Sequence, residues 1–172
     1  DYNYRTNPPP ADGTKVVVSD TDHLWGIGGD PAWVWKSFCR GLNPIFMDPY
    51  DHRVLTRQPD APWEAVRQAL GHTRQLAERL DLTTMMPQDR LASTGYCLAR
   101  PGGEYVVYLP EGGRATVDLS AASGDLRAEW LQAATGKWTS AEAVRGGAER
   151  EVAAPFSGHA VLYLRTAQAG EN

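Results

Sequence analysis

Two short clusters of acidic and histidine side chains are the part of this sequence best suited to chemistry. Each cluster directly follows a short apolar run, and the members are Asp20, Asp22 and His23 in the first and Asp48, Asp51 and His52 in the second. Carboxylates and imidazoles gathered in one place can exchange protons, contact a polar substrate or bind a cation. The plainer alternative is that these aspartates cap the loops and helices that follow them. Both interpretations stay open at this point.

A metal site would require the two clusters to converge on one ion, and carboxylate with imidazole would then suit zinc or manganese. The spacing matches no established metal-binding motif, so we predict no metal ion and no other cofactor. The glycine-rich segment 26–29 lacks the GxGxxG spacing of a dinucleotide-binding loop. Two aromatic side chains next to the clusters, Trp25 and Tyr50, are candidates for contacts with a substrate.

The elements that must position these clusters follow a strand–helix–strand pattern. Residues 15–19 and 43–47 are apolar runs typical of strands buried on both faces of a parallel sheet. Between them, residues 32–40 predict a helix with an Asp-Pro pair at its start and a glycine at its end. A longer amphipathic helix is predicted over residues 62–81. Parallel strands would bring both clusters to the same edge of the sheet.

The second half of the chain has the periodicity of short strands separated by turns. We expect strands near residues 92–99, 104–109, 115–119, 126–131, 142–144, 149–153 and 160–164. Glycine-containing turns separate most of these runs, as in an antiparallel β-sandwich. The predicted fold class is therefore α/β plus all-β.

Composition excludes several classes of function. A net charge of -4 and a sequence pI near 5.5 argue against a nucleic-acid partner, because such proteins usually carry a basic face. No apolar run approaches the ~18 residues that would span a membrane, so we predict no membrane partner. The two cysteines, Cys39 and Cys97, are expected to be buried free thiols.

Longer stretches of the sequence resemble known families. The first half is similar to the end of the barrel in a group of bacterial glycoside-hydrolase-like proteins, through KVVVSDTDHLWGIGGDPAWVWKSFCRGLNPIFMDPYD. The second half resembles the domain that follows that barrel, in a family named for the collagen-binding domain of a collagenase, through LASTGYCLARPGGEYVVYLPEGG, TVDLS, EW and APFSGHAVLYL.

This resemblance implies that residues 1–88 are the last two β/α units of a TIM-type (β/α)8 barrel and that residues 89–168 form a β-sandwich accessory domain, with residues 169–172 as a tail. It also implies an exported bacterial protein, extracellular or periplasmic. We expect that the start of the sequence is incomplete, because two β/α units cannot bury their own strands.

The resemblance further assigns roles to the clusters. Related retaining glycosidases carry a nucleophilic carboxylate at the end of a late barrel strand, where Asp22 matches best and Asp20 next. On this basis, the residues expected to contact the substrate are His23, Trp25, Asp48 and Tyr50. Hydrolysis needs two carboxylates across the scissile bond, about 5–5.5 Å apart for retention or about 6.5–9.5 Å for inversion. The acid/base partner comes from a middle strand in such barrels, so we predict that this chain alone hydrolyses no glycoside.

Three functions remain open. The first is a carbohydrate-active hydrolase whose β-sandwich is docked against the catalytic part, with a carbohydrate substrate as the partner. The second is a non-catalytic binding protein whose β-sandwich attaches to polysaccharide or collagen. The third is a purely structural segment. The short connection over residues 83–90 contains neither glycine nor serine, which favours docking over flexible tethering.

Overall fold

The computed structural model describes residues 1–26, 28–47 and 61–166. Its helices are α1 (Asp22–Trp25), α2 (Pro31–Cys39) and α3 (Ala61–Ala77), with 3-10 turns at Leu82–Thr84 and Asp89–Leu91. Its strands are β1 (Val18–Asp20), β2 (Asn43–Ile45), β3 (Met86–Pro87), β4 (Cys97–Arg100), β5 (Glu104–Leu109), β6 (Gly112–Asp118), β7 (Asp125–Gln132), β8 (Lys137–Arg145), β9 (Glu149–Ser157) and β10 (Ala160–Thr166). None of the helices described is both long enough and apolar enough to cross a bilayer.

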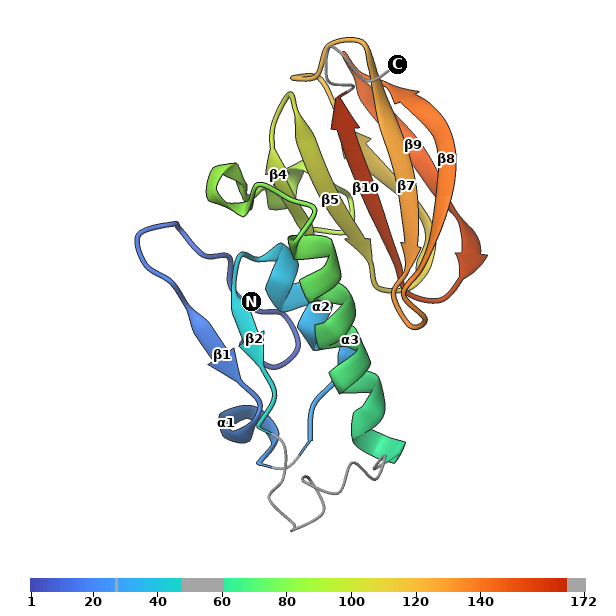
Figure 1. Cartoon of the computed structure of the whole chain (residues 1–172). Coiled ribbons are helices and arrows are strands. Elements are labelled where there is room, and N and C mark those ends of the chain that lie inside the picture. The colour runs from blue at the N-terminus through green and yellow to red at the C-terminus, as the bar shows by residue number, and fades with distance from the viewer. Residues whose placement is uncertain (27, 48–60, 167–172) are drawn as a thin grey trace.

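These elements are arranged in four layers (Figure 1). The parallel pair β1–β2 lies on one side, and α2 and α3 separate it from a six-stranded sheet. That sheet has the order β3-β4-β5-β10-β7-β8, and all of its neighbours are antiparallel. The antiparallel pair β6–β9 covers its other face.

The six-stranded sheet is an inner layer, and both of its faces are buried along β5 and most of β10, whereas the edge strand β8 is largely exposed. Every residue of β5 is buried. Side chains alternate along a strand, so Val106 and Tyr108 pack towards the helices while Tyr105 and Val107 pack towards β6 and β9. The segmentation into short strands is confirmed, since each of the seven expected runs overlaps one of β4–β10.

The apolar core between the helices and the sheet joins the two predicted domains. Helix α2 begins as expected, with Asp30 Oδ1 accepting a hydrogen bond from the Ala32 N–H at 2.9 Å and a proline at the first helical position. On this helix, Trp35 stacks on Tyr108 of β5, with 6.1 Å between ring centroids. The boundary at residue 88 stays a prediction, but the segments on its two sides share one core.

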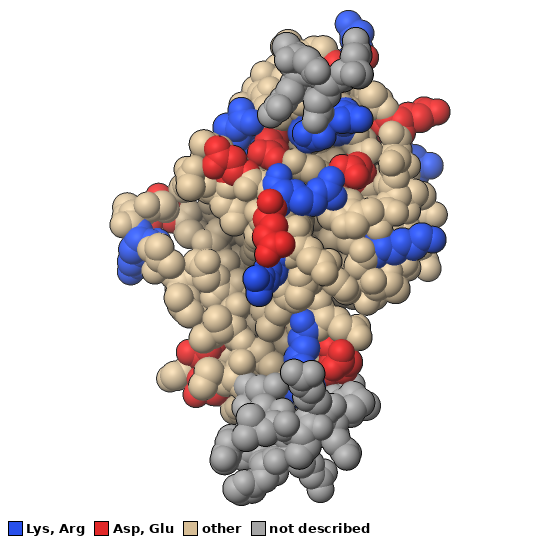
Figure 2. Space-filling model, in the orientation of Figure 1, with Lys and Arg blue, Asp and Glu red and all other residues tan. Residues whose placement is uncertain are grey.

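The parallel pairing of the two apolar runs is confirmed, whereas their predicted burial is wrong. Val18 lies opposite Asn43, and Asp20 lies opposite Ile45. One set of side chains faces solvent, with Val16 80% exposed, Val18 57% and Ile45 43%. The surface over these strands is largely uncharged (Figure 2). An apolar run predicts a strand that other layers cover on both faces. The described part of the chain covers these strands on one face only, so the predicted burial is wrong.

The predicted fold class, the end of a TIM-type barrel followed by a sandwich, is wrong. In the part of the chain that the structure describes, no barrel is closed: β1 and β2 form a sheet of two strands, and all other strand pairs are antiparallel. A strand–helix–strand pattern specifies only that two strands are parallel neighbours. A closed barrel needs further strands, and a single strand–helix–strand pattern gives no information about them.

Candidate functional site

The first acidic cluster forms where β1 ends and turns into the short helix α1. The residue in this turn, Thr21, is fully buried, and its carbonyl oxygen accepts the N–H groups of Leu24 and Trp25 at 3.2 and 2.9 Å. Its hydroxyl oxygen accepts the Met47 N–H at 2.9 Å, which fixes the end of the second apolar run beside the turn. The turn therefore presents the neighbouring polar side chains on the surface.

Three of these side chains are in direct contact. The Nδ1 atom of His23 lies 3.0 Å from Asp20 Oδ1 and 2.6 Å from Asp22 Oδ1. The side chains of Asp20, Asp22 and His23 are 29%, 45% and 82% exposed. These distances bring the three side chains together at the end of β1, while their predicted chemical roles stay predictions.

The electrostatics of the cluster favour a charged pair. Hydrogen bonds with the Asp22 carboxyl group and with His23 lower the pKa of Asp20 below its ordinary value. Hydrogen bonds to Asp20 and Asp22, together with their negative charges, raise the pKa of His23. Both shifts favour an ionised Asp20 beside a protonated imidazole over the same pH range.

This geometry limits what the cluster can do. The imidazole nitrogen fills the space between the two carboxylates, so a sugar cannot lie between them as glycoside hydrolysis requires. At most one of them can act as a nucleophile, with its partner elsewhere. Asp20, Asp22 and His23 each offer one ligand atom within 4.8 Å of the others and could hold a divalent cation once the imidazole loses its proton.

The aromatic candidate Trp25 is half-buried and already has partners. Its ring meets Trp33 edge-to-face, with 5.4 Å between centroids at 77°. The guanidinium of Arg5 lies 5.3 Å from the ring centroid. A sugar that stacked on the ring face occupied by Arg5 would have to displace that guanidinium. The role of Trp25 in substrate contact stays a prediction.

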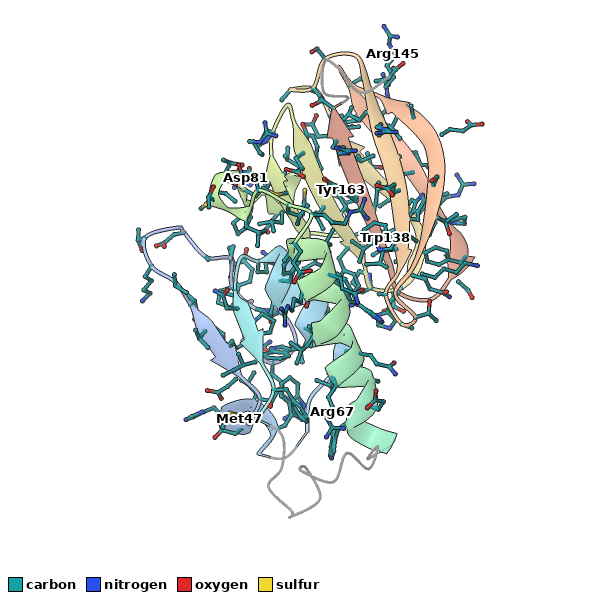
Figure 3. All side chains as sticks on the ribbon, viewed as in Figure 1. Met47, Arg67, Asp81, Trp138, Arg145 and Tyr163 are labelled. Carbon is teal, nitrogen blue, oxygen red and sulfur yellow. The ribbon has the colours of Figure 1, made fainter. Side chains whose placement is uncertain are left out.

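The other predicted site residues, Asp48 and Tyr50, lie outside the described residues, as do Asp51 and His52. The convergence of the two acidic clusters therefore stays a prediction. The last described residue of the second run, Met47, lies at the same end of the molecule as Arg67 of α3 (Figure 3).

Two cations at this end were missed by reasoning from the sequence. Arg5 approaches Trp25, and the Arg67 guanidinium lies 5.6 Å from the centroid of the Phe46 ring. Both contacts join residues about 20 positions apart in the sequence. No local pattern marks such pairs, because arginine is common on surfaces and cation–π contacts depend on the tertiary fold.

Comparisons with known proteins identify structural relatives only. No family model matches the chain, and no curated protein matches it. One solved structure described as a glycoside hydrolase superposes with a TM-score of 0.61 at 13% identity, over 81% of this chain and 36% of that protein. A glycoside hydrolase family 5 protein from Bacteroides vulgatus ATCC 8482 superposes with a TM-score of 0.62 at 14% identity, over 78% of this chain and 35% of that protein.

The chain thus spans about a third of the length of these structural relatives. Nothing in the comparisons supports the collagen-binding part of the resemblance. At such low identities the likeness concerns the fold alone. The chain shares the fold of part of two glycoside hydrolases.

Proposed function

We propose that this chain is a carbohydrate-binding part of a glycoside-hydrolase-like protein, with the cluster of Asp20, Asp22 and His23 in contact with the sugar. The observation that carries the proposal is the position of this exposed, polar cluster at the end of a parallel strand pair. In sheets of this type, ligands bind outside the carboxyl ends of the strands. The fold likeness to glycoside hydrolases supports a carbohydrate as the ligand.

Within the cluster, Asp22 is the better candidate for a reacting carboxylate. Its side chain is 45% exposed against 29% for Asp20, so it is more accessible to a substrate. Asp20 also accepts the backbone N–H of His23 at 3.4 Å, which ties it to the turn. His23 would then orient the carboxylates and donate hydrogen bonds to sugar hydroxyls. Asp48 and Tyr50 complete the proposed set of substrate contacts.

The chain alone is proposed to bind sugar without cleaving it. Hydrolysis needs an acid and a base on opposite sides of the glycosidic bond. The two carboxylates of the cluster share one imidazole and lie on the same side. We therefore expect no release of nitrophenol from aryl glycosides by the purified chain, measured as absorbance over a day.

Binding can be tested by nuclear magnetic resonance. Cello-, xylo- and manno-oligosaccharides would be titrated into the chain while the imidazole signals of His23 are followed. One of the three series should shift these signals, and Asp22→Asn should weaken that binding by about tenfold, as the loss of a charge-assisted hydrogen bond implies. The matched control is Asp125→Asn, because Asp125 is an exposed acid on β7 whose side chain is 61% exposed. If no series shifts His23, or if both variants weaken binding equally, the proposal fails.

The alternative function is attachment to polysaccharide or collagen through the antiparallel sheets. The shared core argues against an independent tethered module, because one face of the six-stranded sheet is already covered by α2 and α3. Retention of the whole chain on insoluble cellulose or on collagen, unaffected by Asp22→Asn, would favour this alternative.

A further inference from the structure

A second candidate site lies at the opposite end of β1 and β2 from the acidic cluster. A cavity of about 540 Å³ opens between the start of these strands, the end of α2 and the segment 82–87. The loop before β1 lies beside the segment 82–87, since Gly13 is adjacent to the Met86 side chain. The cavity shares no residue with the cluster at the other end, so it is a separate site.

The walls of the cavity are mainly apolar. Its deeper residues are buried, with Phe38 8% exposed, Leu42 4% and Leu98 3%. The mouth has larger exposed side chains, among them Leu82 at 41% and Met86 at 38%. A volume in the range of about 300–1,000 Å³ with apolar walls is typical of sites for small molecules. The flexible thioether of Met86 would allow the mouth to adapt to a ligand.

The polar groups at the mouth of the cavity indicate which charge a bound ligand would carry at its polar end. Lys15 is the one charged side chain among the described lining residues. The hydroxyl of Thr14 already donates to Asp12 at 2.7 Å, and the hydroxyl of Thr83 donates to Asp81 at 2.6 Å. These hydroxyls therefore have no hydrogen left for a ligand, whereas the ammonium group of Lys15 has three donors and a positive charge. The Asp12 carboxylate lies close enough to interact with Lys15, but Lys15 is the one positively charged donor among the described lining residues. A complementary ligand therefore carries a single anionic head on an apolar body.

We propose that this cavity binds an alkyl carboxylate, with the hydrocarbon chain against Phe38 and Leu98 and the carboxylate at Lys15. The mainly apolar wall disfavours a neutral sugar, because sugar hydroxyls that face it would lose hydrogen bonds to water without replacement. The site is independent of the proposed sugar contact. It would give the protein an affinity for fatty-acid-like molecules in addition to carbohydrate.

The three methionines of the chain provide a site-specific test. Met85 and Met86 line the cavity, whereas Met47 lies beside Thr21 at the other end of the strand pair. With methyl-labelled methionine, sodium decanoate below its micelle-forming concentration should shift the signals of Met85 and Met86 and leave Met47 unchanged. Equal shifts at all three methyl groups would show adsorption to the exposed apolar strands and would overturn the proposal, as would the absence of shifts.

The role of Lys15 is tested by charge removal. Lys15→Met should weaken decanoate binding by about tenfold, because one charge-assisted contact is lost. Binding of decanol, which has no charge, should stay unchanged. Lys15→Arg should retain decanoate binding. Lys15 is exposed, so both variants are expected to fold, and circular dichroism checks this. If Lys15→Met binds decanoate as the original chain does, the carboxylate is not held there and the proposal is wrong.

Discussion

The core that joins the helices to the six-stranded sheet makes a quantitative prediction at Trp35. This residue is 1% exposed, stacks on Tyr108 and meets Phe38 edge-to-face at 6.4 Å between centroids. Replacing a buried tryptophan by alanine removes its transfer free energy and leaves a cavity, at a cost of about 3–5 kcal/mol. Trp35→Ala should therefore lower the free energy of unfolding by that amount, a large fraction of the stability of a domain this size.

The matched control is Trp35→Phe. The indole Nε1–H of Trp35 is buried without a hydrogen-bond partner in the described structure. An unpaired buried donor costs about 1–3 kcal/mol, and phenylalanine removes that cost while it loses part of the packing. The two effects oppose each other, so Trp35→Phe should change the free energy of unfolding by less than about 1.5 kcal/mol.

Urea unfolding followed by backbone amide signals would separate the two sides of this core. Amides of α3 and of β5 should disappear at the same urea concentration, and Trp35→Ala should move both transitions together. Suppose instead that α3 unfolds first and that only its transition responds to the substitution. The helices and the sheet would then be independent units, and the inference of a docked sheet would be refuted.

Four further outcomes are expected. Asp20→Asn should lower the pKa of His23 towards its ordinary value, because the substitution removes the hydrogen bond to Asp20 that raises this pKa most. The pKa would be measured from imidazole chemical shifts. As pH rises through that raised pKa, the imidazolium and its ion pairs should be lost together. Arg79→Ala should cost about 1 kcal/mol in urea unfolding, since its side chain is 36% exposed and makes an ion pair with β7 and cation–π contacts with rings of β8 and β10. Tyr108→Phe should cost about 1 kcal/mol in the same assay, because the phenol hydroxyl hydrogen-bonds His159 Nδ1 at 2.6 Å.

Much of the secondary structure could be predicted because its causes are local. The aspartate cap at Asp30 and the left-handed glycine Gly41, at a φ of 70°, fix the two ends of α2 from neighbouring residues alone. The run over residues 104–109 matched β5 because a short apolar, β-branched and aromatic run between turn residues is typical of a buried strand. The four-residue helix α1 was not predicted, since so short an element has no periodicity.

What could not be predicted depends on contacts far apart in the chain. The sequence pattern at Val16 and Val18 is the same whether or not other layers cover the strand. Their exposure could therefore not be predicted from the sequence. At the site, Asp20 and Asp22 are two positions apart in the sequence, so their proximity is a local feature. Their shared contact with His23 forms in the turn around the buried Thr21, whose hydroxyl oxygen accepts a hydrogen bond from the distant Met47 N–H.

The parallel orientation of β1 and β2 accounts for two chemically different ends on one strand pair. Parallel strands collect both beginnings at one edge and both ends at the other. The ends carry the ion-paired cluster with Asp22, and the beginnings border the apolar cavity with Lys15 at its mouth. Because the two sites share no residue, Asp22→Asn and Lys15→Met should act independently: sugar binding should respond only to the first substitution and decanoate binding only to the second. Cross-talk between them in a double variant would show that the strand pair shifts as a unit and that the two ends are not separate sites.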